Sequence, residues 1–132
     1  QDAVRGPITY DLVSLLRDCY IAWPRDRVLA WAESHRLALR AAGVTDADAE
    51  TWKRWFDWMG LQRHLKVLGT FARLFLRDGK SAYLDDLPLV IDYVMEITAK
   101  YASDESVFAD FNAWFSQRLS PLVARQPWSN TP

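Results

Sequence analysis

Hydrophobic residues recur along this chain at the spacing of helix faces, and no stretch shows the alternation that is typical of a strand. The pattern predicts helices over residues 9–23, 26–42, 46–78, 87–101 and 103–120, which indicates an all-α bundle of about five or six helices. We assign residues 1–120 to one helical subdomain and expect residues 121–132 to form a poorly ordered tail. The predicted N-caps are Thr9, Thr45 or Asp46, and Ser103; the predicted ends are at Pro24, Gly43, Gly79 and Pro121.

Two of these helices predict packing in more detail. The first carries one apolar face made of Leu12, Leu15, Leu16, Cys19 and Trp23. The stripe in residues 52–59 is offset from the stripe in residues 61–75, so we expect a kink or a change of packing partner at Gly60. Residues 61–78 are apolar around most of the circumference and should form the central helix.

Composition narrows the class of protein. The 132 residues are 50% hydrophobic and 25% charged, as in a globular domain, and the net charge of −1 argues against binding to nucleic acid. No apolar run approaches the roughly 20 residues that span a bilayer, so no membrane segment is expected. The single cysteine, Cys19, cannot form an internal disulfide and is expected to be a buried structural thiol. These features favour a soluble, cytoplasmic protein.

Few residues suggest chemistry by themselves. His35 and His64 lie on apolar lines of separate helices without metal-ligand spacing, which is typical of packed core histidines. Gly79-Lys80-Ser81 is no phosphate-binding loop, because Leu74 stands where that motif needs its first glycine. A basic line follows one helix and forms either a solvated face or, at its start beside Gly60, a ligand contact. The line consists of Arg63, Lys66, Thr70, Arg73 and Arg77.

Three runs carry a resemblance to a known family. Residues 1–12, which include Gly6-Pro7-Ile8-Thr9-Tyr10-Asp11-Leu12, resemble the segment after the catalytic loop in the aminoglycoside-phosphotransferase and choline-kinase family. Residues 15–20 and 55–69 look closer to one branch, the bacterial anomeric kinases for N-acetylmuramate and N-acetylglucosamine. The resemblance covers most of residues 1–78.

This resemblance implies a two-lobed kinase-like fold that uses ATP and magnesium. The family's base lies in a His-x-Asp-x-x-x-x-Asn loop, which this chain does not contain. The family's metal-binding aspartate belongs to an Asp-Phe pair just before the Gly-Pro segment, and the chain begins where that pair should just have ended. The chain alone is therefore expected to hold no cofactor, metal or catalytic residue and to transfer no phosphate. Its expected partner is the missing N-terminal kinase half. Asp11 matches the aspartate that anchors the catalytic loop, a structural role.

The resemblance also implies that the helices form the acceptor side of the cleft. The candidate substrate-binding residues are Asp18, Trp23, Trp58, Arg63 and His64. Asp11 and Asp18 are seven residues apart and share a helix face, which is either an exposed polar face or one that carries a buried anchor (Asp11) and a ligand hydroxyl acceptor (Asp18). We expect the acceptor-binding fragment of an amino-sugar kinase; the alternatives are a free-standing binding or scaffold domain, or a kinase for an aminoglycoside or choline. Self-association is expected through the face that contains residues 1–20.

Overall fold

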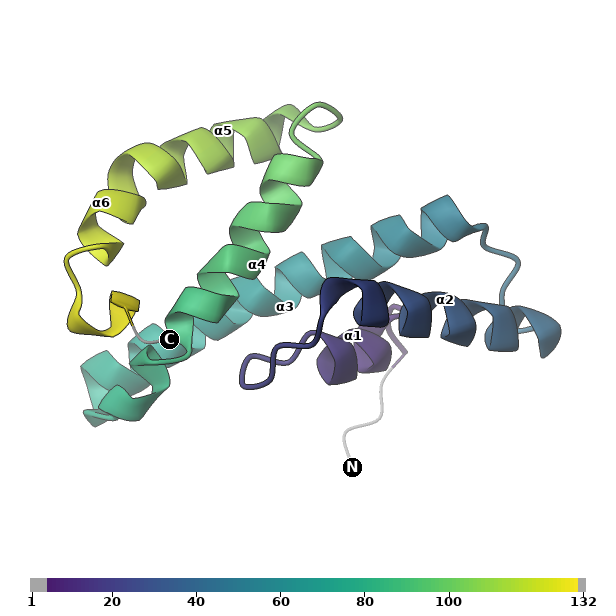
Figure 1. Cartoon of the computed structure of the whole chain (residues 1–132), viewed down its shortest axis with the longest axis horizontal. Helices are drawn as coiled ribbons and strands as arrows, with labels where there is room; N and C mark the ends of the chain where they lie inside the picture. Colours follow the sequence, from purple (N-terminus) through teal and green to yellow (C-terminus); the bar gives the residue numbers. More distant parts are fainter. Residues whose placement is uncertain (1–4, 131–132) are drawn as a thin grey trace. The chain divides into compact units, whose positions relative to one another are not determined.

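The computed structural model describes residues 5–130, which form helices and turns without a strand in that range (Figure 1). The chain divides at Gly60 into two compact units, and each is described by itself. The predicted all-α fold is confirmed. No helix within residues 5–130 is long and apolar enough to cross a membrane.

The first unit packs two helices and the start of a third around one core. The elements are α1 (Tyr10–Leu16), α2 (Arg25–Ala41) and the part of α3 (Ala49–Asp78) that precedes Leu61. The core consists of Val13, Leu16, Val28, Ala32 and Phe56, against which Leu12 and Met59 pack. Trp52 ties α3 to α2, because its buried indole N–H donates a 3.0 Å hydrogen bond to the Ala32 carbonyl.

The first helix is shorter than predicted. It ends at Leu16, and Arg17 leaves helical geometry at φ −121°, ψ 50°. Beyond it, the Asp18 carboxylate accepts the Tyr20 N–H at 3.4 Å, a local bond that competes with helix. The prediction of a helical face carrying Cys19 and Trp23 is therefore wrong.

The same early end separates Asp11 from Asp18. Asp11 lies in the first turn of α1, whereas Asp18 follows the helix, so the two carboxylates do not share a helix face. Pro24 helps to keep this segment out of a helix, because a proline disfavours helical geometry in the residue before it.

The connection between α2 and α3 is fixed by local chemistry. Gly43 follows α2 with φ +68°, a conformation that favours glycine, and confirms the predicted helix end. The cap of α3 is Asp48, which accepts the Thr51 N–H at 2.7 Å, instead of Thr45 or Asp46. Arg36 is buried, donates to the Ala47 carbonyl at 2.9 Å and pairs with Glu33, so it braces this connection from α2.

Helix α3 is helical without interruption through Gly60. The expected change of packing partner is confirmed: Phe56 and Met59 pack in the first core, whereas Leu61 and Leu68 pack in the second. Gly60 is buried, and a methyl group added there would lie 3.7 Å from Val13 Cγ1. That distance is an ordinary van der Waals contact, so α1 packs close to α3 at this position.

The second unit is built on α3 after Gly60, a 3₁₀ turn (Ser81–Leu84), α4 (Leu87–Lys100) and α5 (Ser106–Trp114). Its core contains Leu61, Val94, Ile97 and Tyr101, with Leu68, Phe108 and Phe111 packed against it. The predicted helix over 87–101 is confirmed. Residues 61–78 of α3 bury only part of their circumference, because Leu65 and Leu76 are exposed.

The C-terminal elements differ from the prediction at both ends. Helix α5 begins at Ser106 after Glu105, so Ser103 is not its cap. A π-helical turn (Phe115–Leu119) leads into α6 (Ser120–Val123), where Pro121 occupies the first turn, a position that tolerates proline. The predicted end at Pro121 is wrong. The expected tail contains α6 and a 3₁₀ turn (Pro127–Asn130), while Pro132 lies outside the described residues.

Candidate functional site

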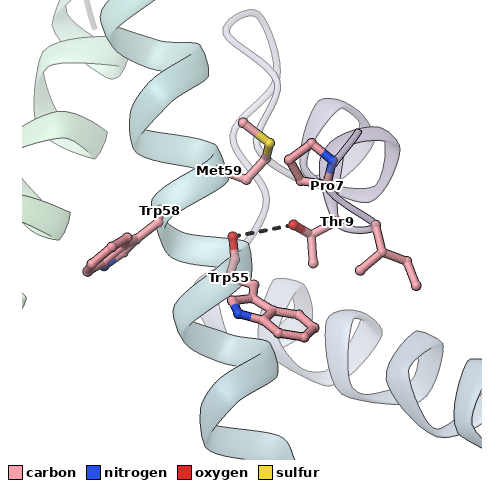
Figure 2. A pocket seen from close by; sticks show the side chains of 6 residues that line it. Pro7, Thr9, Trp55, Trp58 and Met59 are labelled. Atoms are coloured by element: carbon pink, nitrogen blue, oxygen red, sulfur yellow. Dashed lines mark hydrogen bonds between the residues drawn. The ribbon is translucent and has the colours of Figure 1, made fainter. Parts of the chain in front are cut away.

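A first hollow lies in the first unit between the start of α1 and α3 (Figure 2). Its volume is about 450 Å³, and its lining residues are Pro7, Ile8, Thr9, Trp55, Trp58 and Met59. We call it the Trp55–Trp58 pocket. Thr9 is fully buried, and its hydroxyl donates a 3.3 Å hydrogen bond to the Trp55 carbonyl. This bond holds the start of α1 against α3.

The Trp55–Trp58 pocket is chemically simple. Apart from Thr9, whose hydroxyl is already bonded to the Trp55 carbonyl, the lining side chains are apolar or aromatic. Arg54 lies over the Trp58 ring, with its guanidinium carbon 5.4 Å from the ring centroid. The pocket therefore offers apolar contact and few groups that could orient a polyhydroxylated ligand.

A second hollow of about 540 Å³ lies in the same unit and carries more polar chemistry. We call it the Trp23–Trp31 groove. It is lined by Leu12, Leu15, Leu16, Trp23, Trp31, Ser34, His35 and Ala38. The rings of Trp23 and Trp31 meet edge to face, with centroids 5.5 Å apart and planes inclined by 83°. Arg27 stacks over Trp31, with its guanidinium carbon 5.7 Å from the ring centroid.

Each wall of this groove follows from local sequence. Trp31, Ser34, His35 and Ala38 are presented by α2 at helical spacing. Trp23 comes from the non-helical segment that precedes Pro24. The early end of α1 thus carries Trp23 out of the helix, where its ring can meet Trp31.

Titratable groups of the first unit do not form a reactive centre. Partial burial raises the pKa of the Cys19 thiol, and the neighbouring Asp18 carboxylate raises it further. A thiol with a raised pKa stays protonated and is a poor nucleophile. Cys19 is half-buried, instead of fully buried as expected. Among residues 5–130, no group of three or more histidine, cysteine or acidic side chains is arranged to hold a metal ion.

The two predicted acceptor tryptophans of the first unit line different hollows. Trp23 lines the Trp23–Trp31 groove, and Trp58 lines the Trp55–Trp58 pocket. Asp18 is half-buried in the segment after α1. Arg63 and His64 belong to the second unit, on the part of α3 after Gly60.

His64 has the environment of a core residue. Its imidazole is buried and stacks on Tyr93, with ring centroids 4.7 Å apart and planes inclined by 21°. This packing favours the structural interpretation of the residue over a ligand contact. His35, by contrast, is exposed at the Trp23–Trp31 groove, which differs from the expectation of a core histidine.

The sequence analysis missed Trp31, Ser34, His35 and Trp55 as lining residues. A signal for exposed tryptophans was present, because arginine precedes Trp31 and Trp58 by four residues. That spacing brings two helical side chains together, and both pairs form cation–π contacts. A tryptophan that stacks with an arginine at this spacing keeps one face near solvent.

Comparison with curated proteins gives related kinases. The chain is 46% identical to the N-acetylmuramate/N-acetylglucosamine kinase of Neisseria meningitidis serogroup B over 110 residues, which cover 83% of this chain and 33% of the relative. It is 45% identical to the kinase of the same name from Pseudomonas putida over 76% of this chain and 30% of the relative. A protein of that name from Caulobacter vibrioides is 30% identical over 96% of this chain and 32% of its own length.

The chain thus spans about a third of the length of the curated relatives it matches, so it is similar to a fragment of these kinases. No protein-family model matches it. No solved structure matches it significantly.

Proposed function

We propose that this chain is the C-terminal, acceptor-side fragment of an ATP-dependent amino-sugar kinase. The observation that carries the proposal is its identity of 46% and 45% with two N-acetylmuramate/N-acetylglucosamine kinases over most of this chain. The parent protein would phosphorylate these amino sugars in the cytoplasm, as a step of peptidoglycan recycling. Its fold would be that of the aminoglycoside-phosphotransferase family.

Phosphoryl transfer would depend on the remaining two-thirds of the polypeptide. Catalysis of this reaction needs a nucleotide cradle, magnesium ligands and a group that orients the acceptor hydroxyl. The parent's other part would supply all three, with ATP and magnesium as cofactors. Asp11 would contribute indirectly: it is exposed in the first turn of α1, where its carboxylate could accept backbone N–H groups of the catalytic loop.

A chimera tests this proposal. The aligned segment of the Neisseria relative is replaced by this chain, and ATP-dependent phosphorylation of N-acetylglucosamine and N-acetylmuramate is measured. We expect transfer by the chimera and none by the 132-residue chain alone. An Asp11→Asn chimera should lose activity, whereas Asp110→Asn, at an exposed position of α5, should not. A folded chimera that binds ATP and phosphorylates neither sugar would contradict the proposal.

A free-standing helical binding domain is the second candidate. It is favoured by the presence of two ligand-sized hollows within the first unit alone. A chain that binds an amino sugar, while the chimera transfers no phosphate, would support this alternative. Phosphorylation of kanamycin or choline by the chimera, in preference to amino sugars, would indicate a kinase for another acceptor.

A further inference from the structure

The Trp23–Trp31 groove exposes aromatic surface that the core does not use. Trp23 and Trp31 keep 40% and 39% of their surface exposed, whereas Trp52 in the same unit keeps 2%. Their edge-to-face contact fixes the orientation of both rings. A fixed aromatic wall matches the C–H-lined face of a pyranose ring, which is flat and apolar although its edge carries hydroxyl groups.

Polar groups stand beside this wall. Ser34 supplies a hydroxyl and His35 an imidazole, and both side chains are exposed at the groove. Each can donate or accept a hydrogen bond, as sugar hydroxyls and an acetamido group require. A mostly apolar hollow with a few orienting polar groups is typical of small-molecule sites.

The charge of the side chains around the groove favours neutral and anionic ligands over cationic ones. None of the described residues that line it is acidic, and Arg27 lies over Trp31 with its guanidinium 5.7 Å from the ring centroid. A cationic ligand, such as an aminoglycoside or a quaternary ammonium, would meet a like charge there. A neutral sugar would not, and a sugar with a carboxylate would gain from the guanidinium.

We propose that the Trp23–Trp31 groove binds an N-acetylated amino sugar. One pyranose face packs on Trp23, and the hydroxyl and acetamido groups bond to Ser34 and His35. The carboxylate of N-acetylmuramate faces Arg27, which makes Arg27 a specificity-determining residue between the two sugars. The choice of amino sugars rests on the proposed function; the position of the site rests on the groove.

Binding of N-acetylglucosamine and N-acetylmuramate to the 132-residue chain, measured by calorimetry or ligand-observed NMR, tests the site. We expect Trp23→Ala and Ser34→Ala each to weaken binding of both sugars by about tenfold, the effect of one lost contact. Arg27→Gln should weaken binding of N-acetylmuramate and leave N-acetylglucosamine unchanged. The matched controls are Trp114→Ala, at an exposed tryptophan of the second unit, and Arg40→Gln, at an exposed arginine of α2. Both variants should bind the two sugars as the unsubstituted chain does.

Several results would overturn the proposal. One is the absence of binding of either sugar; another is a loss on Trp58→Ala with none on Trp23→Ala, which would place the ligand in the Trp55–Trp58 pocket (Figure 2). Should Trp23→Ala fail to fold by circular dichroism, unchanged binding by both Ser34→Ala and Arg27→Gln is decisive against it. Kinase activity of the chimera distinguishes failure of one proposal from failure of the other. If the chimera is active and Ser34→Ala leaves its KM for the sugar unchanged, the proposed binding site is wrong and the proposed function stands. If the sugar binds at the groove and the chimera transfers no phosphate, the proposed function is wrong and the proposed binding site stands.

Discussion

The indole N–H of Trp52 donates a 3.0 Å hydrogen bond to the backbone carbonyl of Ala32, joining α3 to α2 within the first unit. Trp52 is almost fully buried, and its ring also contacts His35 of the Trp23–Trp31 groove at a centroid distance of 6.1 Å. The same residue therefore holds the first unit together and supports one wall of the groove.

Replacement of Trp52 tests this support. Trp52→Phe should lower the free energy of unfolding by about 1–3 kcal/mol, because the hydrogen bond is lost and the smaller ring leaves a gap. Trp52→Ala should cost about 3–5 kcal/mol. Denaturant titration followed by circular dichroism measures both. Trp114→Phe, at an exposed tryptophan, is the control and should change the value by less than about 0.5 kcal/mol.

Two carboxylates predict acid sensitivity of the first unit. Hydrogen bonds from Arg36 hold the pKa of Glu33 below its ordinary value of 4.5, and the backbone N–H of Thr51 holds the pKa of Asp48 below its ordinary 3.8. Because both pKa values are lowered in the folded state, their contribution is present above the unfolded pKa and is lost as the pH falls through the folded pKa. The thermal midpoint should therefore be level above about pH 6 and fall below about pH 5.

The double variant Glu33→Gln/Asp48→Asn checks the source of this dependence. The thermal midpoint of the double variant should be lower than that of the unsubstituted chain at pH 7 and should change less between pH 6 and pH 3. Asp110→Asn, which changes an exposed carboxylate of α5, should keep the parent's profile. Identical pH profiles of the double variant and the parent would show that other groups govern acid sensitivity.

Two glycines, one within α3 and one directly after it, should change stability in opposite directions when replaced by alanine. Gly69 lies in the helix, and an added methyl group would meet no atom within 4 Å, so Gly69→Ala should raise the free energy of unfolding by about 0.5–1 kcal/mol. Gly79 ends the same helix with φ +66°, so Gly79→Ala should lower it by about 1–2 kcal/mol. Chemical denaturation of the two variants side by side measures the difference. Equal effects would mean that the left-handed end at Gly79 does not form.

The bounds of α2 and α4 were predicted closely from the sequence, because the apolar spacing and the residues at the helix ends indicate the same bounds. Gly43 follows α2, and Val90, Val94 and Ile97 are buried on α4, three to four residues apart as on one helix face. The first helix was predicted to be too long, because Cys19 and Trp23 continue the helical spacing of apolar residues. The backbone conformation there is set by the hydrogen bond to the Asp18 carboxylate and by the approach to Pro24. The spacing of apolar residues contains no information about either.

The candidate site was predictable only in part. Trp23 and Trp58 were predicted as acceptor residues, and each lines a hollow, but in two different hollows. Sequence spacing places residues on the faces of one helix; it does not tell which faces of separate helices meet. Trp31 lies at an apolar position of the predicted helix over 26–42, but its ring stacks with Arg27 and stays near solvent.

Exposed apolar side chains near the start of the chain predict self-association. Leu15 of α1 keeps 69% of its surface exposed, and Ile8, Tyr10, Tyr20 and Ile21 are exposed nearby in sequence. Apolar surface of this kind favours contact with a second copy of the chain or with another part of the proposed kinase. We expect sedimentation velocity to show a dimer or larger assembly at high concentration. Leu15→Glu should shift it toward monomer, because a charge at this surface opposes its burial.

Leu76→Glu is the matched control for this prediction. Leu76 is a leucine of the second unit with 81% of its surface exposed, so the substitution adds the same charge at an equally open position. Leu76→Glu should leave the assembly intact if the contact lies on the face containing residues 1–20. A monomeric parent chain at high concentration would contradict self-association altogether. Dissociation by Leu76→Glu alone would assign the contact to the second unit and not to the exposed residues of the first.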